Sequence, residues 1–404
     1  MKRIIFHVDV NNAFLSWSAV YLLKTGFPKD IRTTASIIGG DEKERRGIVL
    51  AKSPIAKTMG IKTAMSLYEA RKLCKNLEIY PPNYEFYREQ SKIVYQYLST
   101  FTPLIEQASV DESYLDMTGM HYLYQDPIKL AYEIKDYIKE HFGFTVNVGI
   151  ANSKLCAKMA SDFEKPDKVH TLFREEIPKK MWPLPVDDLF MVGKKSALKL
   201  HQLGIHTIGD LAHTDENLLR RHFKSFGTYM KQSALGIDES EVIKESGSSK
   251  CISTMLNLPN DTADILYLKR KLLEEAEDVG RSLRKQELFA KCVAITYRTA
   301  NFVTYSHQVS LLNAINATND IYKVAISLFD KSFRGDDLRA IGIRLSNFVE
   351  ETSEQLSFFD EESHPVETSK VQKLIDNIKD KYGEESIMLA SFLDNDMKKR
   401  NHLK

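Results

Sequence analysis

Three acidic residues lie in two short motifs about a hundred positions apart. Asp9 ends the apolar run KRIIFHVDV, and Asp111 and Glu112 lie within SVDESYLD. Three carboxylates at one point repel each other unless a counter-charge lies among them. Hard oxygen ligands in that number favour Mg²⁺, with Mn²⁺ as an alternative, and Mg²⁺ usually takes further ligands from substrate phosphates. If the fold brings these acids together, the predicted chemistry is phosphoryl transfer by two metal ions.

Two predicted strands must position these acids. KRIIFHVDV indicates a buried strand, because β-branched and aromatic residues follow one another without a helical period. The alternation in IEQASVDESYLDMTG predicts a β-hairpin with its turn near Asp111 and Glu112. Neighbouring residues of a regular strand point to opposite faces, so these two acids can share a site only at a turn or bulge. Taken singly, Asp9 could be a strand-end cap and the DES triplet a solvated turn.

The remaining pattern predicts a mixed α+β architecture. We expect helices over 13–24, 84–101 and 127–141, a strand over 145–150, and an amphipathic helix in ANSKLCAKMASDF. Two helices on one face of the sheet would make an α+β sandwich. Short helices and glycine turns follow, and EVIKESGSSK indicates a linker. From about 250 to 348 the order is strand, helix, two strands, helix, strand, typical of a split βαβ unit, and an acidic tail ends in a helix over 370–382.

The motifs together carry a resemblance to one family. HVDVNNAF, SVDESYLD, ANSKLCAKMASDFEKP and the glycine-turn region DDLFMVGKKSALKLHQLGIHTIGDLA resemble the successive motifs of Y-family, translesion-synthesis DNA polymerases, in order and spacing. The resemblance implies an error-prone, template-directed polymerase that extends a primer 3′-OH with dNTPs. It also implies a right-hand fold: palm (1–20 and 80–170), fingers (21–79), helix-hairpin-helix thumb (171–240), linker (241–249), little finger (250–348) and tail (349–404).

The resemblance also assigns roles at the acidic site. Asp9, Asp111 and Glu112 match the family's metal-binding acids, and the main-chain carbonyl of Val10 is implied as a further ligand for two Mg²⁺ ions. Phe14 matches the family's steric gate, because an aromatic face against C2′ of the incoming sugar leaves no volume for a 2′-hydroxyl. Phe14 could also be plain core at the start of a helix.

Two lysines match the positions that hold the triphosphate, Lys57 and Lys165. Lysine is a compact cation suited to phosphate, and charge on the leaving pyrophosphate needs neutralising. This sequence departs from the family pattern nearby, since Lys57 stands where arginine is usual and Pro54 where a tyrosine is common. The resemblance therefore implies a triphosphate site whose contacts are distributed differently.

Other basic positions are predicted to contact primer-template DNA. Gly193, Lys194 and Lys195 lie at a predicted helix start in the thumb, where exposed backbone N–H groups bind phosphate without reading sequence. On the predicted strands of the little finger, Arg298 and Arg344 are candidates for backbone phosphates.

A short apolar motif lies in the acidic tail. The sequence QLSFF, with Gln355, Leu356, Phe358 and Phe359, resembles the bacterial peptide that binds the sliding clamp. An exposed Leu-x-Phe-Phe without a core of its own suits the groove of another protein, although it could pack back on its own little finger. The length of chain beyond QLSFF resembles the catalytic subunit of polymerase V more than a short polymerase IV.

Composition limits the other possibilities. The 56 Lys and Arg nearly balance the 55 Asp and Glu of the 404 residues, so any polyanion must be bound by local clusters. Four scattered cysteines indicate neither a zinc site nor a disulfide framework, which favours a cytoplasmic protein, and no 18 consecutive apolar residues predict a membrane span. We expect a monomer. The alternatives are a non-catalytic DNA- and clamp-binding scaffold, or a nucleotide cyclase. The string Gly39-Gly40-Asp41-Glu42 resembles a cyclase signature, but its position in the predicted fingers and the basic run after it favour a turn.

Overall fold

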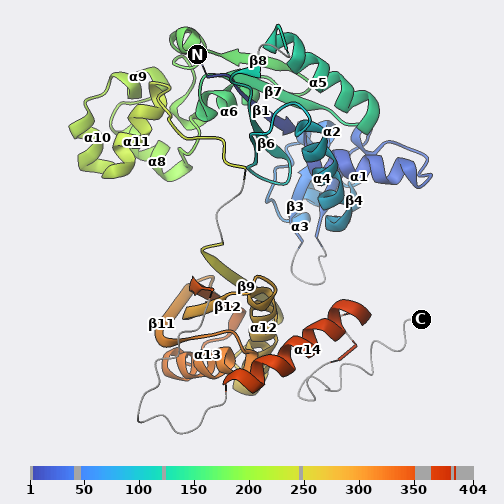
Figure 1. Ribbon diagram of the computed structural model, residues 1–404, viewed down its shortest axis with the longest axis vertical. Helices are drawn as coiled ribbons and strands as arrows, with labels where there is room; N and C mark the ends of the chain where they lie inside the picture. The colour runs from blue at the N-terminus through green and yellow to red at the C-terminus, as the bar shows by residue number, and fades with distance from the viewer. Residues whose placement is uncertain are drawn as a thin grey trace. The chain divides into compact units, whose positions relative to one another are not determined.

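The computed structural model describes residues 3–40, 47–120, 124–244, 249–350, 365–383 and 386–387 (Figure 1). The chain divides into two compact units, one from Met1–Gly40 with Gly47–Gly247 and the other mainly from Ser248–Lys404. Among the described residues, no helix combines the length and the apolar character that crossing a membrane requires.

A five-stranded sheet forms the centre of the first unit. Its order is β5-β6-β1-β7-β8, and β1 pairs antiparallel with both β6 and β7. The strands are β1 (Ile5–Val10), β5 (Ile105–Gln107), β6 (Glu112–Asp116), β7 (Val146–Ala151) and β8 (Val169–Leu172). Every residue of β1 is buried, as the apolar run KRIIFHVDV predicts for a central strand. The expected hairpin is present as β5 and β6.

The two faces of β1 carry different residues because side chains alternate along a strand. Phe6, Val8 and Val10 belong to a core that includes the apolar sides of α4 (Tyr84–Leu98) and α5 (Pro127–Phe142). This places two helices on one face, as expected, although α4 ends three residues before the predicted position. His7 and Asp9 occupy alternate positions to that core, and their side chains contact α6 (Lys154–Asp162).

Helix α6 lies unusually close to the sheet at Gly149 of β7. A Cβ at this glycine would lie 2.0 Å from the Ala157 carbonyl oxygen and 2.5 Å from the Ser161 nitrogen. No side chain fits there without moving the helix. Gly149 also pairs in register with His7 of β1, so the close approach brings the side chains of α6 within reach of β1.

Smaller elements complete the first unit. Helix α1 (Ala13–Lys24) follows β1 and contributes the buried Trp17. A three-stranded sheet in the order β3-β2-β4 has its own small core. Its elements are η1 (Ile31–Thr33), β2 (Ser36–Gly39), β3 (Val49–Lys52), α2 (Pro54–Thr58), α3 (Leu67–Leu73) and β4 (Glu78–Tyr80).

The segment after β8 is helical, as its glycine turns and short apolar runs predict. Its apolar residues share a core with α6, so the helices pack on the sheet side that carries α6. The elements are η3 (Arg174–Glu176), α7 (Ile177–Lys180), η4 (Val186–Asp188), α8 (Lys194–Gln202), α9 (Ile208–His213), α10 (Glu216–Phe223) and α11 (Ser225–Ala234).

The second unit has the predicted element order. A four-stranded antiparallel sheet, β11-β10-β12-β9, carries two helices packed on one face through a shared apolar core. The elements are β9 (Cys251–Thr262), α12 (Ile265–Lys285), β10 (Phe289–Thr299), β11 (Thr304–Ile315), α13 (Thr318–Ser332) and β12 (Leu338–Val349).

The final helix, α14 (Pro365–Tyr382), begins five residues before the predicted start. It packs against α12 mainly through charged side chains. Asp376 and Lys379 are buried and pair with Arg284 and Glu277, whereas Leu374 of the same helix is 62% exposed. This arrangement reverses the usual amphipathic pattern, in which the apolar stripe faces the core.

Candidate active site

Strand pairing brings the three candidate acids to one end of β1 and β6. The Cα atoms of Asp9 and Glu112 are register partners across the two strands. The Val10 amide donates a hydrogen bond to the Asp111 carbonyl oxygen at 3.0 Å, so the backbone that carries Asp111 and Val10 is joined directly. The expected pairing of the strands is therefore present, while the metal-binding roles of these residues stay a prediction.

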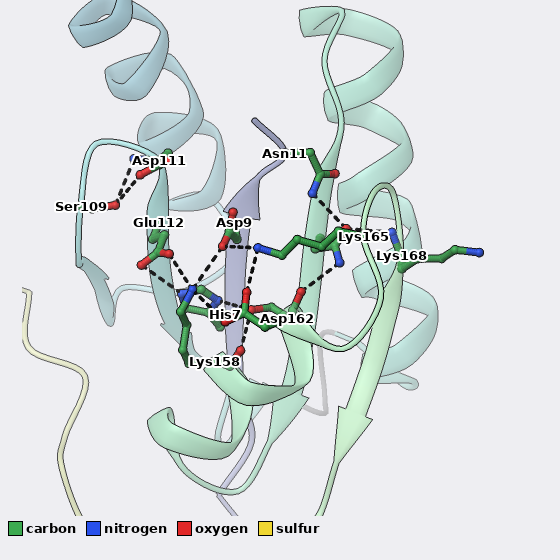
Figure 2. A network of polar contacts seen from close by, with 12 residues as sticks. His7, Asp9, Asn11, Ser109, Asp111, Glu112, Lys158, Asp162, Lys165 and Lys168 are labelled. Carbon is green, nitrogen blue, oxygen red and sulfur yellow. Dashed lines mark hydrogen bonds and ion pairs between the residues drawn. The ribbon is translucent and has the colours of Figure 1, made fainter. Parts of the chain in front are cut away.

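The turn between β5 and β6 explains how two adjacent acids can share this edge. Residues 108–111 form the turn, because the Ala108 and Ser109 amides both donate to the Glu112 carbonyl oxygen. Asp111 thus ends the turn and Glu112 begins the strand. The Asp111 carboxylate accepts a hydrogen bond from the Ser109 hydroxyl at 2.6 Å, and Figure 2 shows it directed to Ser109, whereas Glu112 points toward Lys158.

Lys158 of α6 lies between the acids, and its ammonium group contacts three carboxylates. It donates to Glu112 Oε1 at 2.6 Å and to Asp9 Oδ2 at 3.3 Å, and its nitrogen lies 3.3 Å from Asp162 Oδ2. The side chain is 10% exposed. Burial alone would lower the pKa of Lys158, but the Glu112 hydrogen bond and the surrounding carboxylates raise it, so Lys158 stays an ammonium ion.

Lys165 supplies a second ammonium group to the same cluster. Its nitrogen lies 2.8 Å from Asp9 Oδ2 and 2.8 Å from Asp162 Oδ1. Both lysines therefore contact the same oxygen of Asp9. Burial opposes the charge on Lys165, but the adjacent Asp9 carboxylate raises its pKa.

Two asparagines hold the segment that carries Lys165. Asn11 donates to Asn147 Oδ1 and accepts from the Asp167 amide, so it links the end of β1 to the chain just after Lys165. Asn147 donates to the carbonyl oxygens of Ser161 and Glu164. Figure 2 shows Lys165 extending from this segment toward Asp9.

Burial raises and neighbouring cations lower the pKa of both central acids, but burial prevails at Asp9 and the cations prevail at Glu112. Burial raises the pKa of Asp9 above its ordinary value, even though Lys165 and Lys158 both act to lower it. The pKa of Glu112 is held well below its usual range by His7 and by Lys158. His7 Nε2 lies 3.8 Å from Glu112 Oε2, which is too long for a hydrogen bond, so we assign the larger part to Lys158 at 2.6 Å.

His7 is fully buried beside this cluster. Its Nδ1 is 2.8 Å from the Ser161 hydroxyl, its ring contacts Tyr114, and its Nε2 has no hydrogen-bond partner within the described part of the chain. Because Ser161 lies on α6, this hydrogen bond also connects that helix to β1.

The donor set suits a hard divalent cation, although its carboxylates are engaged elsewhere in this structure. Asp9, Asp111 and Glu112 offer the oxygen donors that Mg²⁺ and Mn²⁺ prefer. Among the described residues, however, no three acidic, histidine or cysteine side chains gather closely enough to form a metal cluster. Lysine ammonium groups form ion pairs with Asp9 and Glu112, and the Ser109 hydroxyl donates a hydrogen bond to Asp111. The residues therefore fit the metal by chemistry, and binding requires local rearrangement of their side chains.

Phe14 lies at the start of α1 within a group of aromatic rings. Its ring stacks on Tyr87 at a centroid distance of 4.7 Å and meets the edge of Tyr84 at 6.1 Å. Tyr87 is in turn held by a hydrogen bond to Ser18. Phe14 is only partly buried, so the ring combines a fixed orientation with an accessible portion.

Lys57 is the predicted phosphate ligand that the structure leaves apart from the acids. It is exposed on α2, and among the described contacts none joins it to Asp9, Asp111 or Glu112. Burial, with a smaller contribution from the charge of Lys57, lowers the pKa of the neighbouring Lys52. The Lys52 carbonyl oxygen accepts a hydrogen bond from Asn12, which ties this sheet to the end of β1.

The predicted DNA-contact residues are exposed in their own units, except Arg298, which is partly buried. Gly193 is the N-cap of α8, and Lys194 and Lys195 occupy its exposed first turn. In the second unit, Arg344 of β12 pairs in register with Ala294 of β10, and Arg298 lies four residues after Ala294 on β10. The alternation of side chains places both arginines on the sheet face opposite α12 and α13. The clamp-motif residues Gln355, Leu356, Phe358 and Phe359 lie outside the described residues.

The sequence interpretation assigned no role to three residues around the acids, Lys158, His7 and Asn147. Lys158 belongs to the motif in which only Lys165 was predicted to have a role. One signal was available for Lys158, because it interrupts a run in which small and apolar residues otherwise predominate, KLCAKMASD. A lysine in the middle of such a run must find a buried partner.

Comparison with known proteins decides the family. A family model described as the impB/mucB/samB family matches residues 8–162, its HHH motif matches 174–205, and its C-terminal domain matches 249–358. A curated relative named DNA polymerase IV, from Clostridium acetobutylicum, is 43% identical over 98% of this chain and 100% of its own length. The chain belongs to the Y-family of DNA polymerases.

Other relatives agree with this assignment. A Bacillus subtilis protein named DNA polymerase IV 1 is 34% identical over 97% of this chain and 94% of its own length. A solved Y-family DNA polymerase chimera shares the fold with a TM-score of 0.75 at 22% identity, covering 86% of this chain and all of that chain. This Y-family polymerase is thus a DNA-directed DNA polymerase with the expected α+β, right-hand fold.

The comparisons also correct one expectation about the subgroup. We expected the length beyond QLSFF to resemble polymerase V more than polymerase IV. The full-length relatives are named DNA polymerase IV, so the tail does not separate this Y-family polymerase from that group. Neither the scaffold nor the cyclase alternative is favoured by any of these relatives.

Proposed function

We propose that Asp9, Asp111, Glu112 and the Val10 carbonyl oxygen hold two Mg²⁺ ions for template-directed DNA synthesis, with Mn²⁺ able to replace Mg²⁺. When bound, such ions supply a stabilised primer 3′-oxygen and neutralise charge on the reacting phosphates. The observation that supports this role is the pairing of Asp9 with Glu112 across β1 and β6, beside the turn that ends at Asp111. The product is a primer longer by one nucleotide, together with pyrophosphate.

The lysines have distinct roles in this proposal. Lys165 can release Asp9 and turn to the triphosphate, because its side chain is 35% exposed whereas Asp9 is nearly buried. Lys57, exposed on α2, approaches the same triphosphate from the small sheet that Asn12 ties to β1. Two ammonium groups would then balance the negative charge on the departing pyrophosphate.

Phe14 is proposed as the gate that selects deoxyribose. Stacking on Tyr87 fixes the ring plane, and an apolar face at C2′ offers a 2′-hydroxyl neither volume nor a hydrogen bond. A rigid ring suits this role better than a mobile side chain would, because discrimination depends on a steric clash that the protein cannot relieve.

Contacts with DNA are proposed at two places, both independent of sequence. The exposed first turn of α8, from Gly193 to Lys195, suits a backbone phosphate because helix N–H groups without intrahelical partners and two exposed lysines occur there together. Arg298 and Arg344, on the open face of the second sheet, suit phosphates of the duplex. We further propose that Gln355, Leu356, Phe358 and Phe359 bind the sliding clamp, and that the enzyme acts as a monomer in the bypass of damaged template bases.

The decisive experiment is primer extension with Mg²⁺, dNTPs and the variant Asp111→Ala. We expect extension to fall by at least about a thousandfold, since a lost metal ligand removes several kcal/mol of transition-state stabilisation. DNA binding, measured by fluorescence anisotropy, should change little because the contacts to the duplex lie elsewhere.

A matched control is Asp136→Ala, which removes a half-exposed carboxylate on α5 that pairs with Lys135 and, among the described contacts, does not touch the three acids. It should retain full extension. Full activity of Asp111→Ala would refute the metal role, and DNA binding without extension by the intact protein would favour the scaffold.

A further inference from the structure

Lys158 has a position that its neighbours do not explain as ordinary packing. Its ammonium group lies among Asp9, Glu112 and Asp162, at distances of 3.3, 2.6 and 3.3 Å. The side chain projects from α6 into the sheet and is 10% exposed. A lysine in this position is too enclosed to act as a surface phosphate ligand, so its function concerns the acids themselves.

The charge balance shows what Lys158 contributes. Asp9, Glu112 and Asp162 together carry three negative charges, while Lys158 and Lys165 supply two positive charges. Without Lys158, Asp9 would keep Lys165 as its cationic partner, and Glu112 would have no ammonium group among the described residues, only the His7 ring at 3.8 Å. Buried carboxylates without a counter-charge strongly disfavour the folded state. The site therefore needs a cation whenever no metal is bound.

The geometry of the contacts separates the two lysines. Lys165 contacts Asp9 and Asp162 and is partly exposed, so it can leave without disturbing the sheet. Lys158 bridges Asp9 and Glu112, the two acids whose Cα atoms are paired across β1 and β6. It thus occupies the position between two proposed metal ligands, where a divalent ion would also have to bind.

We infer that Lys158 is a built-in cation that stands in for a divalent ion between Asp9 and Glu112 while the polymerase carries no nucleotide. This inference rests on the proposed function, because it takes both acids as metal ligands. Its consequence is weak metal binding by the enzyme alone, since an incoming ion must compete with a held ammonium group.

The incoming nucleotide would reverse this competition. The triphosphate brings several negative charges and further oxygen ligands, which Mg²⁺ normally shares with a protein. Added negative charge at a distance of a few ångströms strongly favours a second cation. Lys158 therefore couples metal loading to nucleotide arrival, and it acts as a positioning residue rather than one that touches the reacting atoms.

The primary test measures Mn²⁺ affinity without DNA or nucleotide, by titration calorimetry with the free-Mn²⁺ signal in electron paramagnetic resonance as a second readout. The variant Lys158→Met keeps the length and apolar stem of the side chain but removes the charge. We expect it to bind Mn²⁺ about five- to tenfold more tightly than the wild type, because the competing cation is gone. Lys158→Arg, which keeps the charge, should bind within about twofold of the wild type.

Lys154→Met is the matched control. Lys154 lies one turn earlier on α6 and is also held by a carboxylate, since it donates to both oxygens of Glu106 at 2.7 Å. It contacts none of the three proposed metal acids among the described interactions. Its replacement should leave Mn²⁺ affinity unchanged, so an effect common to both variants would indicate nonspecific surface charge and would overturn the inference.

Thermal unfolding provides a second readout that does not depend on catalytic activity. In EDTA, Lys158→Met should melt several degrees below the wild type, and Mn²⁺ should restore more of the loss than it adds to the wild type. Adding Glu112→Gln to Lys158→Met removes one of the repelling charges and should recover part of the melting temperature. If neither variant folds, or if the double variant is no more stable than the single one, the role of Lys158 is packing and the inference fails.

The outcomes separate this inference from the proposed function. Equal or weaker Mn²⁺ affinity in a folded Lys158→Met protein overturns the inference while leaving the metal role of Asp9 standing. If instead the wild type binds no Mn²⁺ that Asp9→Ala abolishes, the metal assignment itself fails, and the inference fails with it.

Discussion

The two units of the polymerase each bury a cation against carboxylates, but they do so in different ratios. In the first unit, the single ammonium group of Lys158 contacts three carboxylates, those of Asp9, Glu112 and Asp162. In the second unit, Arg284 of α12 pairs with one carboxylate, Asp376 of α14, through two contacts of 2.7 and 3.1 Å. A third guanidinium nitrogen of Arg284 donates to the Asn316 carbonyl oxygen.

This difference separates an ion pair that only stabilises the fold from one that can exchange its cation. Arg284 offers a rigid planar fork whose donors are matched by fixed acceptors, so the pair is complete. Around Lys158 the acids outnumber the cations, and a compact ammonium group can be exchanged for another ion. We expect an incomplete charge balance, rather than burial alone, to mark a site that accepts a ligand.

The two buried sites should differ most in their effect on catalytic activity. Asp9→Asn should reduce primer extension by about a thousandfold or more, because the neutral amide is a poor metal ligand and no longer balances the two lysines. Asp376→Asn, measured in the same assay without a clamp, should retain extension within about twofold. Comparable losses in both variants would show that the buried pair in the second unit is also part of the catalytic machinery.

The buried pair of the second unit should instead matter for the local stability of α14. Asp376→Ala leaves Arg284 buried without its carboxylate, and breaking a buried pair in this way costs about 3–5 kcal/mol. We expect faster amide hydrogen exchange in α14 and at the end of α12, measured by mass spectrometry on the full chain. The matched control is Asp330→Ala, which removes a half-exposed partner of Lys269 and should leave the exchange of both helices unchanged.

Replacing both partners of the buried pair sharpens this prediction. Arg284→Met combined with Asp376→Leu should recover most of the protection of α14, since apolar residues of similar volume can replace a buried pair at little cost. If the double variant exchanges as fast as Asp376→Ala, the hydrogen bonds of Arg284 to Asn316 and Thr318 hold the helix instead.

The smallest expected effect concerns the exposed part of the same contact. Lys285 lies 2.9 Å from Asp380, and both side chains are about half exposed. Lys285→Ala should raise the exchange rate of α14 only slightly, and raising the salt concentration should abolish the difference from the wild type. Hydrogen exchange at low and high salt measures this; a large, salt-independent effect would contradict the ranking of buried over exposed pairs.

Local patterns predicted much of the fold because they depend on local physics. The run of β-branched and aromatic residues in KRIIFHVDV predicted the buried strand β1, and the order of elements from 250 to 348 followed from the sequence pattern. The start of α14 was less predictable. Its buried face is charged, so the helical pattern that periodicity detects gives no boundary there.

The site was only half predictable, and distance along the chain explains which half. Asp9, Asp111 and Glu112 carry their own chemical signature, and antiparallel pairing is enough to bring them together. The position of Lys158 depends on which strand α6 covers, and the contact of Asn11 with Asn147 joins residues 136 positions apart. No local pattern encodes such contacts, because they arise from packing between elements.

The glycine at position 149 makes the whole arrangement sensitive to a single methyl group. With the Ala157 carbonyl oxygen only 2.0 Å from where a Cβ would lie, even alanine would push α6 outward and carry the Lys158 ammonium group away from Asp9 and Glu112. The distance between Lys158 and the acids thus depends on the missing side chain of a glycine on the neighbouring strand of the same sheet. Substitutions at Gly149 should therefore disturb the site as strongly as substitutions of the acids themselves.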